Sequence, residues 1–342
     1  ARRAVSEALK VKLALFLRNS DSLVAQQQGN FAAHHFVSVS MNRRHFLALS
    51  SAASVSALAA STSGSTLHIA TNTYPWGTFA KRDGQAFKLH SDEALAAIAS
   101  CGLQGHEPAI TSLAEFEGLG GRLKAHGLEM RSLYVNSTLH EDSQAAESIA
   151  SVTAIAQRAA QLGCKIIVTN PSPLKWGGSE SKTDAQLTTQ AHALDTLGAA
   201  LLKLGISLAY HNHDMELRNG AREFHHMLTA TSAENVKFCL DAHWVFRGCG
   251  DSQVALFDAL ELHGSRIVEL HLRQSAGGLW TEVFTGQGDI DYTRLLAWLQ
   301  KHSLKPHLVL EQAVEKGSPH TMDAVKAHQQ SQENTRVVFA TL

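Results

Sequence analysis

The chain of 342 residues has a formal net charge of −1, and 44% of its residues are hydrophobic and 18% charged. This composition is typical of a globular protein with enough apolar material for one large core. A net charge so close to zero offers no electrostatic basis for binding a polyanion, so we predict no nucleic acid partner. The four cysteines show no Cys-x-x-Cys spacing, which favours buried thiols over a disulfide framework.

The first 66 residues are predicted to lie outside the folded domain. Residues 1–40 precede Met41 and show no sustained pattern, so we interpret them as an upstream extension or a disordered leader. Residues 41–60 begin with Arg43-Arg44 and continue as an Ala-rich run, which resembles a twin-arginine signal peptide. That run is shorter than the roughly 20 apolar residues that span a bilayer, so no stable membrane insertion is expected. Residues 61–66 are predicted to form a flexible linker.

A twin-arginine signal implies the twin-arginine export machinery as a partner and a periplasmic location. Replacing Arg43 and Arg44 with Lys is therefore expected to leave the protein in the cytoplasm, because this machinery reads the arginine pair. Fractionation of cells that express the variant and the parent protein measures the result. Normal delivery of the variant to the periplasm would contradict the twin-arginine interpretation.

From residue 67 to residue 342, short apolar runs alternate with longer amphipathic segments. This rhythm predicts eight strand–helix units, which is the size and order of a single-domain (β/α)8 TIM barrel of the α/β class. An open doubly wound sheet is the alternative, but no Gly-x-Gly-x-x-Gly follows the first strand. The predicted strands are 67–72, 103–107, 128–135, 165–169, 206–211, 236–241, 266–272 and 307–311; the predicted helices are 91–101, 112–126, 143–162, 184–204, 221–230, 252–262, 292–302 and 321–338.

Several helix ends carry recognisable signals. Ser91 is predicted to cap the first helix, and Asp291 the helix that begins at residue 292, which favours a tight turn over a phosphate-binding loop for residues 286–291. Glycines that stand just before strands are predicted to be the left-handed residues that end the preceding helices. These are Gly102, Gly127, Gly163, Gly205 and Gly264.

Four successive predicted strands end in side chains that can bind metal. The fifth strand ends at His211 and His213, and the next three end at Asp241, His271 and Glu311. The carboxyl ends of barrel strands meet at one face, so these side chains are expected to converge on one divalent cation. Oxygen and imidazole ligands suit Mn, Zn, Mg or Co without selecting among them. Such a cation can polarise a sugar carbonyl and acidify the adjacent C–H.

Other polar and aromatic residues fall at the same predicted face. Glu107 ends the second strand and is a candidate catalytic residue that orients a hydroxyl, or else part of a structural ion pair. Asn170 and His243 are candidate substrate contacts at the ends of the fourth and sixth strands. Trp residues in or near the loops after strands can stack on sugar rings or simply pack; they are Trp76, Trp176, Trp244 and Trp280, with Trp244 the favoured substrate contact.

Residues 67–342 resemble the sugar phosphate isomerase/epimerase superfamily of xylose isomerase-like TIM barrels. The resemblance rests on Tyr210-His211-Asn212-His213-Asp214-Met215-Glu216, Leu240-Asp241-Ala242-His243-Trp244, Arg247-Gly248-Cys249-Gly250-Asp251, His271-Leu272-Arg273, Gly286-Gln287-Gly288-Asp289-Ile290-Asp291 and Leu310-Glu311. It implies a divalent metal held by Asp241, His271 and Glu311.

The resemblance also implies a fourth ligand on strand five, where many relatives carry Glu and this chain shows Ala209. We predict that His213 replaces that ligand and that His211 carries the proton, with Glu311 as a second catalytic residue; Glu216 is a weaker candidate ligand. Relatives often have Lys-Asp where Arg273-Gln274 stands. Arg273 is then expected to be a fixed cation that holds substrate oxygens, with a surface salt bridge as the alternative.

These residues predict a metal-dependent sugar isomerase or epimerase that moves a proton next to a carbonyl of a small carbohydrate. The first alternative is a lyase that removes the aglycone from 3-keto-glycosides by using the same metal site. A non-catalytic periplasmic sugar-binding protein is the second alternative, and the ligand set Asp241, His271 and Glu311 argues against it. The sequence leaves open whether the protein forms an oligomer.

Overall fold

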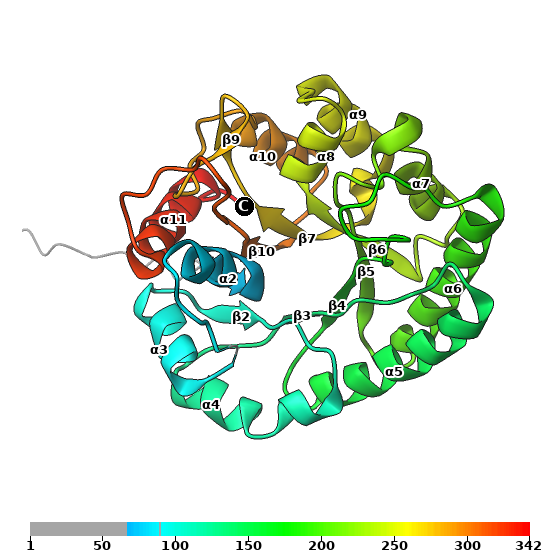
Figure 1. The fold of residues 1–342 in the computed structure, drawn as a ribbon, viewed down its shortest axis with the longest axis horizontal. Helices are drawn as coiled ribbons and strands as arrows, with labels where there is room; N and C mark the ends of the chain where they lie inside the picture. Colours follow the sequence, from blue (N-terminus) through cyan, green and yellow to red (C-terminus); the bar gives the residue numbers. More distant parts are fainter. Residues whose placement is uncertain (1–66, 89) are drawn as a thin grey trace, which may run out of the picture. The chain divides into compact units, whose positions relative to one another are not determined.

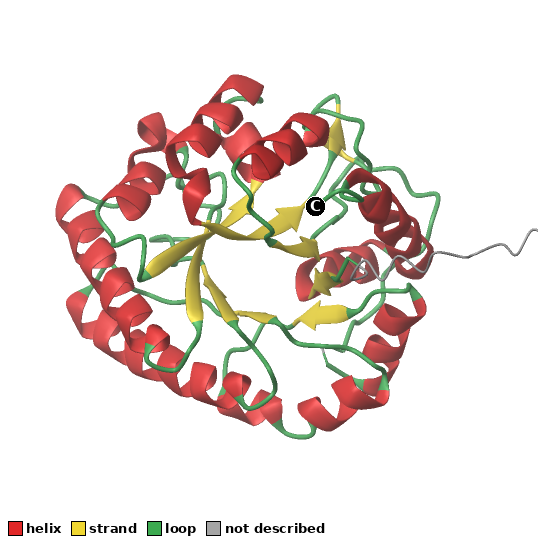
Figure 2. Ribbon diagram, turned by 180° about the vertical axis from the view of Figure 1, so that it is seen from behind, coloured by secondary structure: helices red, strands yellow, loops and turns green. Residues whose placement is uncertain are grey.

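The strands form a central barrel and the helices surround it (Figure 1). The computed structural model describes residues 67–88 and 90–342. The predicted leader, signal peptide and linker therefore lie outside the described residues. Figure 2 shows the same ring of helices around the barrel from the opposite side.

All eight barrel strands are parallel, which confirms the predicted (β/α)8 fold. They run in the order β2-β1-β10-β7-β6-β5-β4-β3, and single bridges from Gly105 to Glu129 and from Ala109 to Tyr134 nearly close the gap between β2 and β3. The strands are β1 Ile69–Asn72, β2 Gly105–Glu107, β3 Ser132–Tyr134, β4 Ile166–Thr169, β5 Ser207–His211, β6 Val236–Asp241, β7 Ile267–Leu272 and β10 His307–Leu310.

Gly105 permits the close approach that brings β2 towards the segment before β3. A Cβ atom at this position would lie 2.7 Å from Cε1 of His68 and 2.9 Å from the carbonyl oxygen of Glu129. Both distances are far shorter than a carbon atom tolerates. The absence of a side chain therefore lets the His106 amide donate to the Glu129 carbonyl at 2.9 Å.

The outer helices follow the predicted order. Ser91 and Asp291 cap their helices as predicted, whereas the predicted helix 112–126 divides at Gly118, whose φ is 66°. Its two parts are the 3-10 turn η1 and the helix α4. The outer elements are α3 Asp92–Ser100, η1 Leu113–Phe116, α4 Leu119–Ala125, α5 Asp142–Ala160, α6 Asp184–Leu202, α7 Arg218–Thr229, α9 Gln253–His263, η2 Gly264–Arg266, α10 Tyr292–Lys301 and α11 Ala324–Val338.

Two further helices and a short hairpin were not predicted, and all three follow barrel strands. The helix α2, Thr73–Arg82, begins directly after β1 with Asn72 as its N-cap, and α8, Ala242–Gly248, begins directly after β6 with Asp241 as its N-cap. The strands β8, Ser275–Ala276, and β9, Leu279–Trp280, form the hairpin after β7. The α8 helix and the hairpin are too short for a periodic pattern to reveal them, and α2 begins in the segment that is predicted to be the loop after the first strand. Figure 1 shows α2 and α8 inside the ring of outer helices.

Four of the five glycines predicted to be left-handed have positive φ angles between 67° and 95°, but Gly264 does not. Its φ is −59°, so the prediction for this residue is wrong. A Cβ atom at Gly264 would lie 2.3 Å from the ring of Trp298. This glycine is therefore required for close packing and not for its backbone conformation.

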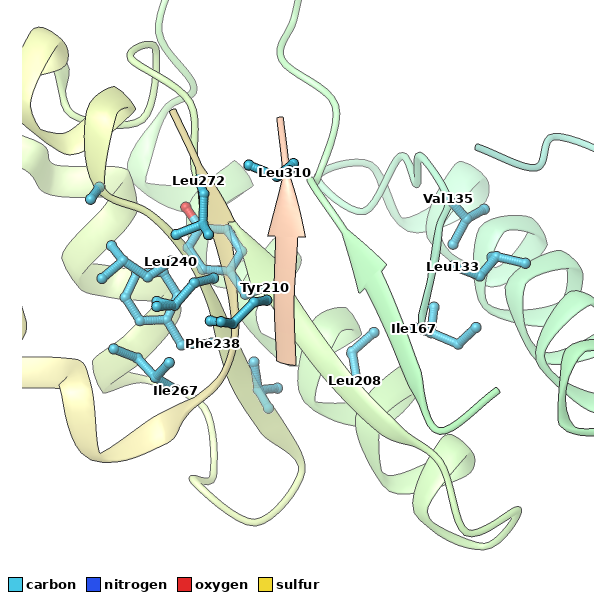
Figure 3. Packing of buried hydrophobic residues seen from close by; sticks show 14 of the residues in the cluster. Leu133, Val135, Ile167, Leu208, Tyr210, Phe238, Leu240, Ile267, Leu272 and Leu310 are labelled. Atoms are coloured by element: carbon cyan, nitrogen blue, oxygen red, sulfur yellow. The ribbon is translucent and has the colours of Figure 1, made fainter. Parts of the chain in front are cut away.

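The main hydrophobic core lies between the barrel and its helices. Alternate strand residues such as Ile167, Leu208 and Leu240 point outward into it and are at most 1% exposed (Figure 3). Each such side chain contributes about 1.5–3 kcal/mol of stability by burial. The barrel interior holds a small apolar cluster that includes Val168, Ala209 and Cys239. Ala209 therefore fills the interior below the strand ends.

In the part of the chain that the structure describes, none of the helices combines the length and the apolar character needed to cross a bilayer.

Candidate active site

Three side chains that can bind metal converge at the carboxyl ends of the strands: the predicted ligands Asp241 and Glu311, and His211, which was predicted to carry the proton. His211 ends β5, Asp241 ends β6 and Glu311 follows β10, and each offers a ligand atom within 4.8 Å of the other two. His271 on β7 joins them, because its Nδ1 lies 2.5 Å from Oε2 of Glu311. The parallel register explains the convergence, since it places Asp241 beside His271 at one level of the barrel.

The side chains of this group fit a divalent cation. Nδ1 of His211 and Oδ2 of Asp241 are buried without a hydrogen-bond partner among the described residues, whereas both ring nitrogens of His271 face carboxylates. An unsatisfied buried polar atom costs about 1–3 kcal/mol, so two such atoms in one group need an explanation. Burial lowers the pKa of His211 well below its usual value, which keeps the imidazole neutral and its lone pair available. A bound cation would satisfy these donor atoms.

His213 lies beside this group and not within it. The strand β5 ends at His211, and the chain then turns, with the Glu216 carboxylate accepting a hydrogen bond of 2.7 Å from the His213 amide. The His213 ring is centred 4.8 Å from the His211 ring and faces the cavity described below. Burial lowers the pKa of His213 to about 4, so this imidazole is also neutral. The geometry thus favours His211 over His213 as the strand-five ligand.

Glu216 supports the turn after β5 and is not part of the donor group. Its other oxygen accepts a hydrogen bond of 3.1 Å from Asn170, whose amide also donates to the His211 carbonyl at 2.9 Å. Asn170 is fully buried and is not among the described residues that line the cavity. The structure therefore places Asn170 behind the site, where it holds the β5 turn, and does not place it at the substrate as predicted.

His243 also lies behind the site. It is fully buried, and its Nε2 lies 3.0 Å from Oγ of Ser275 on the hairpin that carries Trp280. The predicted substrate contact at His243 is thus replaced by a role in fixing this hairpin. Trp244 does face the cavity, and its amide donates to Oδ1 of Asp241 at 3.0 Å.

Arg273 is a completely buried cation next to the donor group. Its Nη2 lies 2.5 Å from Oε1 of Glu311 and 3.5 Å from Oδ2 of Asp241, and its Nε donates to the Glu311 carbonyl. The guanidinium also lies 4.3 Å from the ring centre of Trp280 and 4.7 Å from that of Trp244. The alternative of a surface salt bridge is therefore wrong. Arg273 orients the two carboxylates, and among the described residues it does not line the cavity.

The positive charge of Arg273 acts to lower the pKa of both carboxylates, Asp241 and Glu311. Burial raises the pKa of Asp241 to about 6, although Arg273 opposes the shift. Burial acts in the same direction on Glu311, but the charges of His271 and Arg273 outweigh it and hold the pKa of Glu311 below its usual range. Glu311 is therefore ionised, as a metal ligand must be.

Two carboxyl groups below the site contact the far side of His271. Its Nε2 lies 3.1 Å from Oε1 of Glu107 and 3.3 Å from Oε1 of Glu269. Glu107 also accepts a hydrogen bond of 2.8 Å from Ser132, and Glu269 lies 3.0 Å from Nδ1 of His307. Carboxylates in this position fix the orientation of a ligand imidazole. Burial and the charge of Glu269 raise the pKa of Glu107 to about 8.

Glu269 was not predicted as a site residue. Its signal is present in the sequence, because Glu269 stands two residues before His271 within an otherwise apolar strand. Side chains two residues apart on a strand share one face, so an acid there points into the barrel with the histidine. Asn72, which donates to Oε2 of Glu311 at 2.9 Å, likewise supports the donor group from β1.

A cavity of about 550 Å³ opens above the donor group. This volume lies within the range of about 300–1,000 Å³ that is typical of small-molecule sites. Its lining includes the predicted site residues Glu107, His211, His213, Trp244 and Glu311. The other lining residues are Asn72, Thr73, Tyr74, Ala109, Tyr134, Asn136, Trp176, Gly177, Asp214, Met215 and Arg218.

Solved structures of sugar-converting proteins share this fold. A sugar phosphate isomerase/epimerase from Parabacteroides distasonis ATCC 8503 is 15% identical, with a TM-score of 0.64 over 82% of this chain and 96% of that chain. D-psicose 3-epimerase from Clostridium cellulolyticum H10 is 14% identical, with a TM-score of 0.61 over 80% of this chain and 99% of that chain. The 3-keto-D-glucoside 4-epimerase from E. coli is 16% identical, with a TM-score of 0.55 over 79% of this chain and 99% of that chain.

No curated protein sequence matches this chain. The sequence does match the family described as "Xylose isomerase-like TIM barrel" over residues 95–336, which is more than half of the chain. Together with the eight parallel strands, this match shows that the chain belongs to the family of xylose isomerase-like TIM barrels.

Proposed function

We propose that the protein is a divalent-metal-dependent sugar isomerase or epimerase. The observation that carries the proposal is the convergence of His211, Asp241 and Glu311, with His271 in contact, below an open cavity. The likeness to solved sugar epimerases supports a sugar as the substrate.

His211, Asp241, His271 and Glu311 would hold one divalent ion, and oxygen and nitrogen donors of this kind suit Mn, Zn, Mg or Co. Such an ion, when bound, supplies a Lewis acid that polarises a sugar carbonyl. Glu107 and Glu269 hold the His271 ring from behind, and Arg273 and Asn72 hold the carboxylate of Glu311. The ligand atoms are thus fixed by contacts that do not depend on substrate.

Proton transfer requires groups that reach the substrate carbon from the cavity wall. His213 and Glu107 both line the cavity, from the β5 turn and from β2 respectively. In the strand order, four strands on one side and two on the other separate β5 from β2, so the two groups border the cavity from different strands, with Glu107 beside His271. An epimerase removes a proton from one face of a carbon and returns one to the other face, and groups from different strands suit this exchange.

The metal site is tested by Asp241→Asn, with Asp184→Asn as the matched control. Asp184 is an exposed carboxylate that pairs with Arg222, remote from the donor group. Removing a residue that only hydrogen-bonds to a metal ligand costs about 10–100-fold in metal affinity. Removing the ligand Asp241 itself is therefore expected to cost at least about 100-fold. Metal analysis of the purified variants measures this directly.

Activity is measured as solvent deuterium incorporated into a panel of ketoses, aldoses and 3-keto-glucosides. Asp241→Asn is expected to abolish the incorporation, and Asp184→Asn is expected to retain it. Equal metal content in the two variants would place the metal elsewhere, and no incorporation by the metal-loaded parent protein would overturn the proposed reaction.

A further inference from the structure

The cavity carries an unusual share of the exposed aromatic surface. Among the described residues, Trp176 and Tyr74 are the only exposed large aromatic side chains, at 51% and 47% exposure. Both line the cavity above the donor group. Exposed aromatic rings that are confined to one cavity indicate a ligand with an apolar face.

Contacts between neighbouring side chains connect these two rings, partly along the cavity wall and partly behind it. Trp176 contacts His213 with ring centres 5.4 Å apart, and His213 lies 5.8 Å from Trp244. Behind the wall, the guanidinium of Arg273 lies 4.7 Å from the ring centre of Trp244 and 5.6 Å from that of Tyr74. The two rings are nearly perpendicular, at 86°, so at least one face of the indole is free of this neighbour.

The loop that carries Trp176 is anchored by α7 on the C-terminal side of the ring. It follows β4, and Arg218 of α7 donates to the Gly178 carbonyl at 2.7 Å. Further along the loop, Asn219 donates to Ser181 at 2.8 Å, and Lys182 forms a buried ion pair with Glu223 at 2.6 Å. Trp176 is therefore a fixed exposed ring at the cavity mouth. Because the ring is exposed, it does not contribute to the hydrophobic core.

The position of Trp176 relative to the donor group sets what it can contact. His211 touches His213, and His213 touches Trp176, so Trp176 lies one ring beyond the donor group. A sugar ring seated over His211 and His213 would thus direct a substituent towards Trp176. A free monosaccharide would leave this part of the cavity to water.

We propose that Trp176 and Tyr74, together with Met215 of the same cavity lining, form a subsite for an aromatic aglycone. The substrate class is then a glycoside of a ketone-bearing sugar, and not a free sugar. That the substrate contains a ketone-bearing sugar rests on the proposed function. The aglycone subsite rests only on the aromatic residues of the cavity. Aromatic contacts contribute beyond the area they bury, and a contribution of about 1.4 kcal/mol corresponds to an expected tenfold gain in affinity.

The test compares the binding of phenyl glucosides and methyl glucosides of the same anomeric configuration. Neither carries a ketone, so binding is measured by calorimetry or by indole fluorescence without turnover. The parent protein is expected to bind the phenyl glucoside about tenfold more tightly than the methyl glucoside. Trp176→Ala is expected to abolish that preference, so that the two glucosides bind this variant with equal affinity.

Leu262→Ala is the matched control, because Leu262 is 66% exposed on α9 and does not line the cavity. It is expected to retain the full preference for the phenyl glucoside. Equal affinity of the parent protein for the two glucosides would overturn the aglycone subsite, and so would an undiminished preference in Trp176→Ala. The binding assay requires no proton transfer, so its outcome is separate from the deuterium assay that tests the proposed function.

Discussion

Replacing His211 with Gln is expected to strip the divalent ion from the protein, whereas His213→Gln is expected to keep the ion and to slow turnover by about 100-fold or more. The two side chains are two residues apart and both are neutral, but only His211 shares a donor group with Asp241 and Glu311. His213 instead faces the cavity beyond the end of β5. One variant thus tests the ligand and the other tests the proton carrier.

Metal analysis together with kcat of the reconstituted variants separates these two roles. His320→Gln is the matched control, because His320 is 63% exposed and, among the residues that the structure describes, forms an ion pair only with Asp83. It is expected to match the parent protein in both measurements. Full metal content in His211→Gln, or metal loss confined to His213→Gln, would contradict the assignment and restore His213 as the ligand.

The convergence at the strand ends could be predicted from the sequence because one physical rule controls it. Asp241, His271 and Glu311 each follow a short apolar run, and parallel barrel strands bring such positions to one face. The strand bounds followed from the same apolar runs. The proposed ligands at the ends of β6, β7 and β10 could therefore be predicted without knowledge of side-chain contacts.

The roles of the histidines could not be predicted, because strand periodicity ends where the strand ends. The prediction placed His213 on the face of Ala209 by extending β5, but the chain turns after His211 and Glu216 holds the turn. That contact depends on the tertiary position of Asn170, which adjacent residues do not reveal. The same limit explains why Asn170 itself was assigned to the substrate.

Buried charge was the second feature that the sequence concealed. Arg273 follows an apolar strand and could be either exposed or buried, and only the packing of Trp244, Trp280 and Glu311 around it decides the matter. Glu269 was hidden for a different reason. An acid within an apolar strand is unfavourable unless it is paired, and its partners His271 and His307 lie on β7 and β10.

Arg273→Met is expected to destabilise the metal-free protein by about 3–5 kcal/mol, since it removes one partner from a fully buried ion pair. The carboxylates of Glu311 and Asp241 would lose the cation that lies 2.5 Å and 3.5 Å from them. Arg247→Met is the matched control, because Arg247 also pairs with a carboxylate, Glu315, and stacks on Trp280, but this pair is partly exposed. Its loss is expected to cost about 1 kcal/mol or less.

Urea denaturation with and without added divalent ion tests the reason for this difference. A cation that binds the folded state stabilises it in proportion to its affinity, and that affinity rises when a neighbouring positive charge is removed. Added ion is therefore expected to stabilise Arg273→Met more than the parent protein and to recover part of the loss. It is expected to stabilise Arg247→Met and the parent protein equally. An equal increment in all three proteins would show that Arg273 does not share its carboxylates with the metal site.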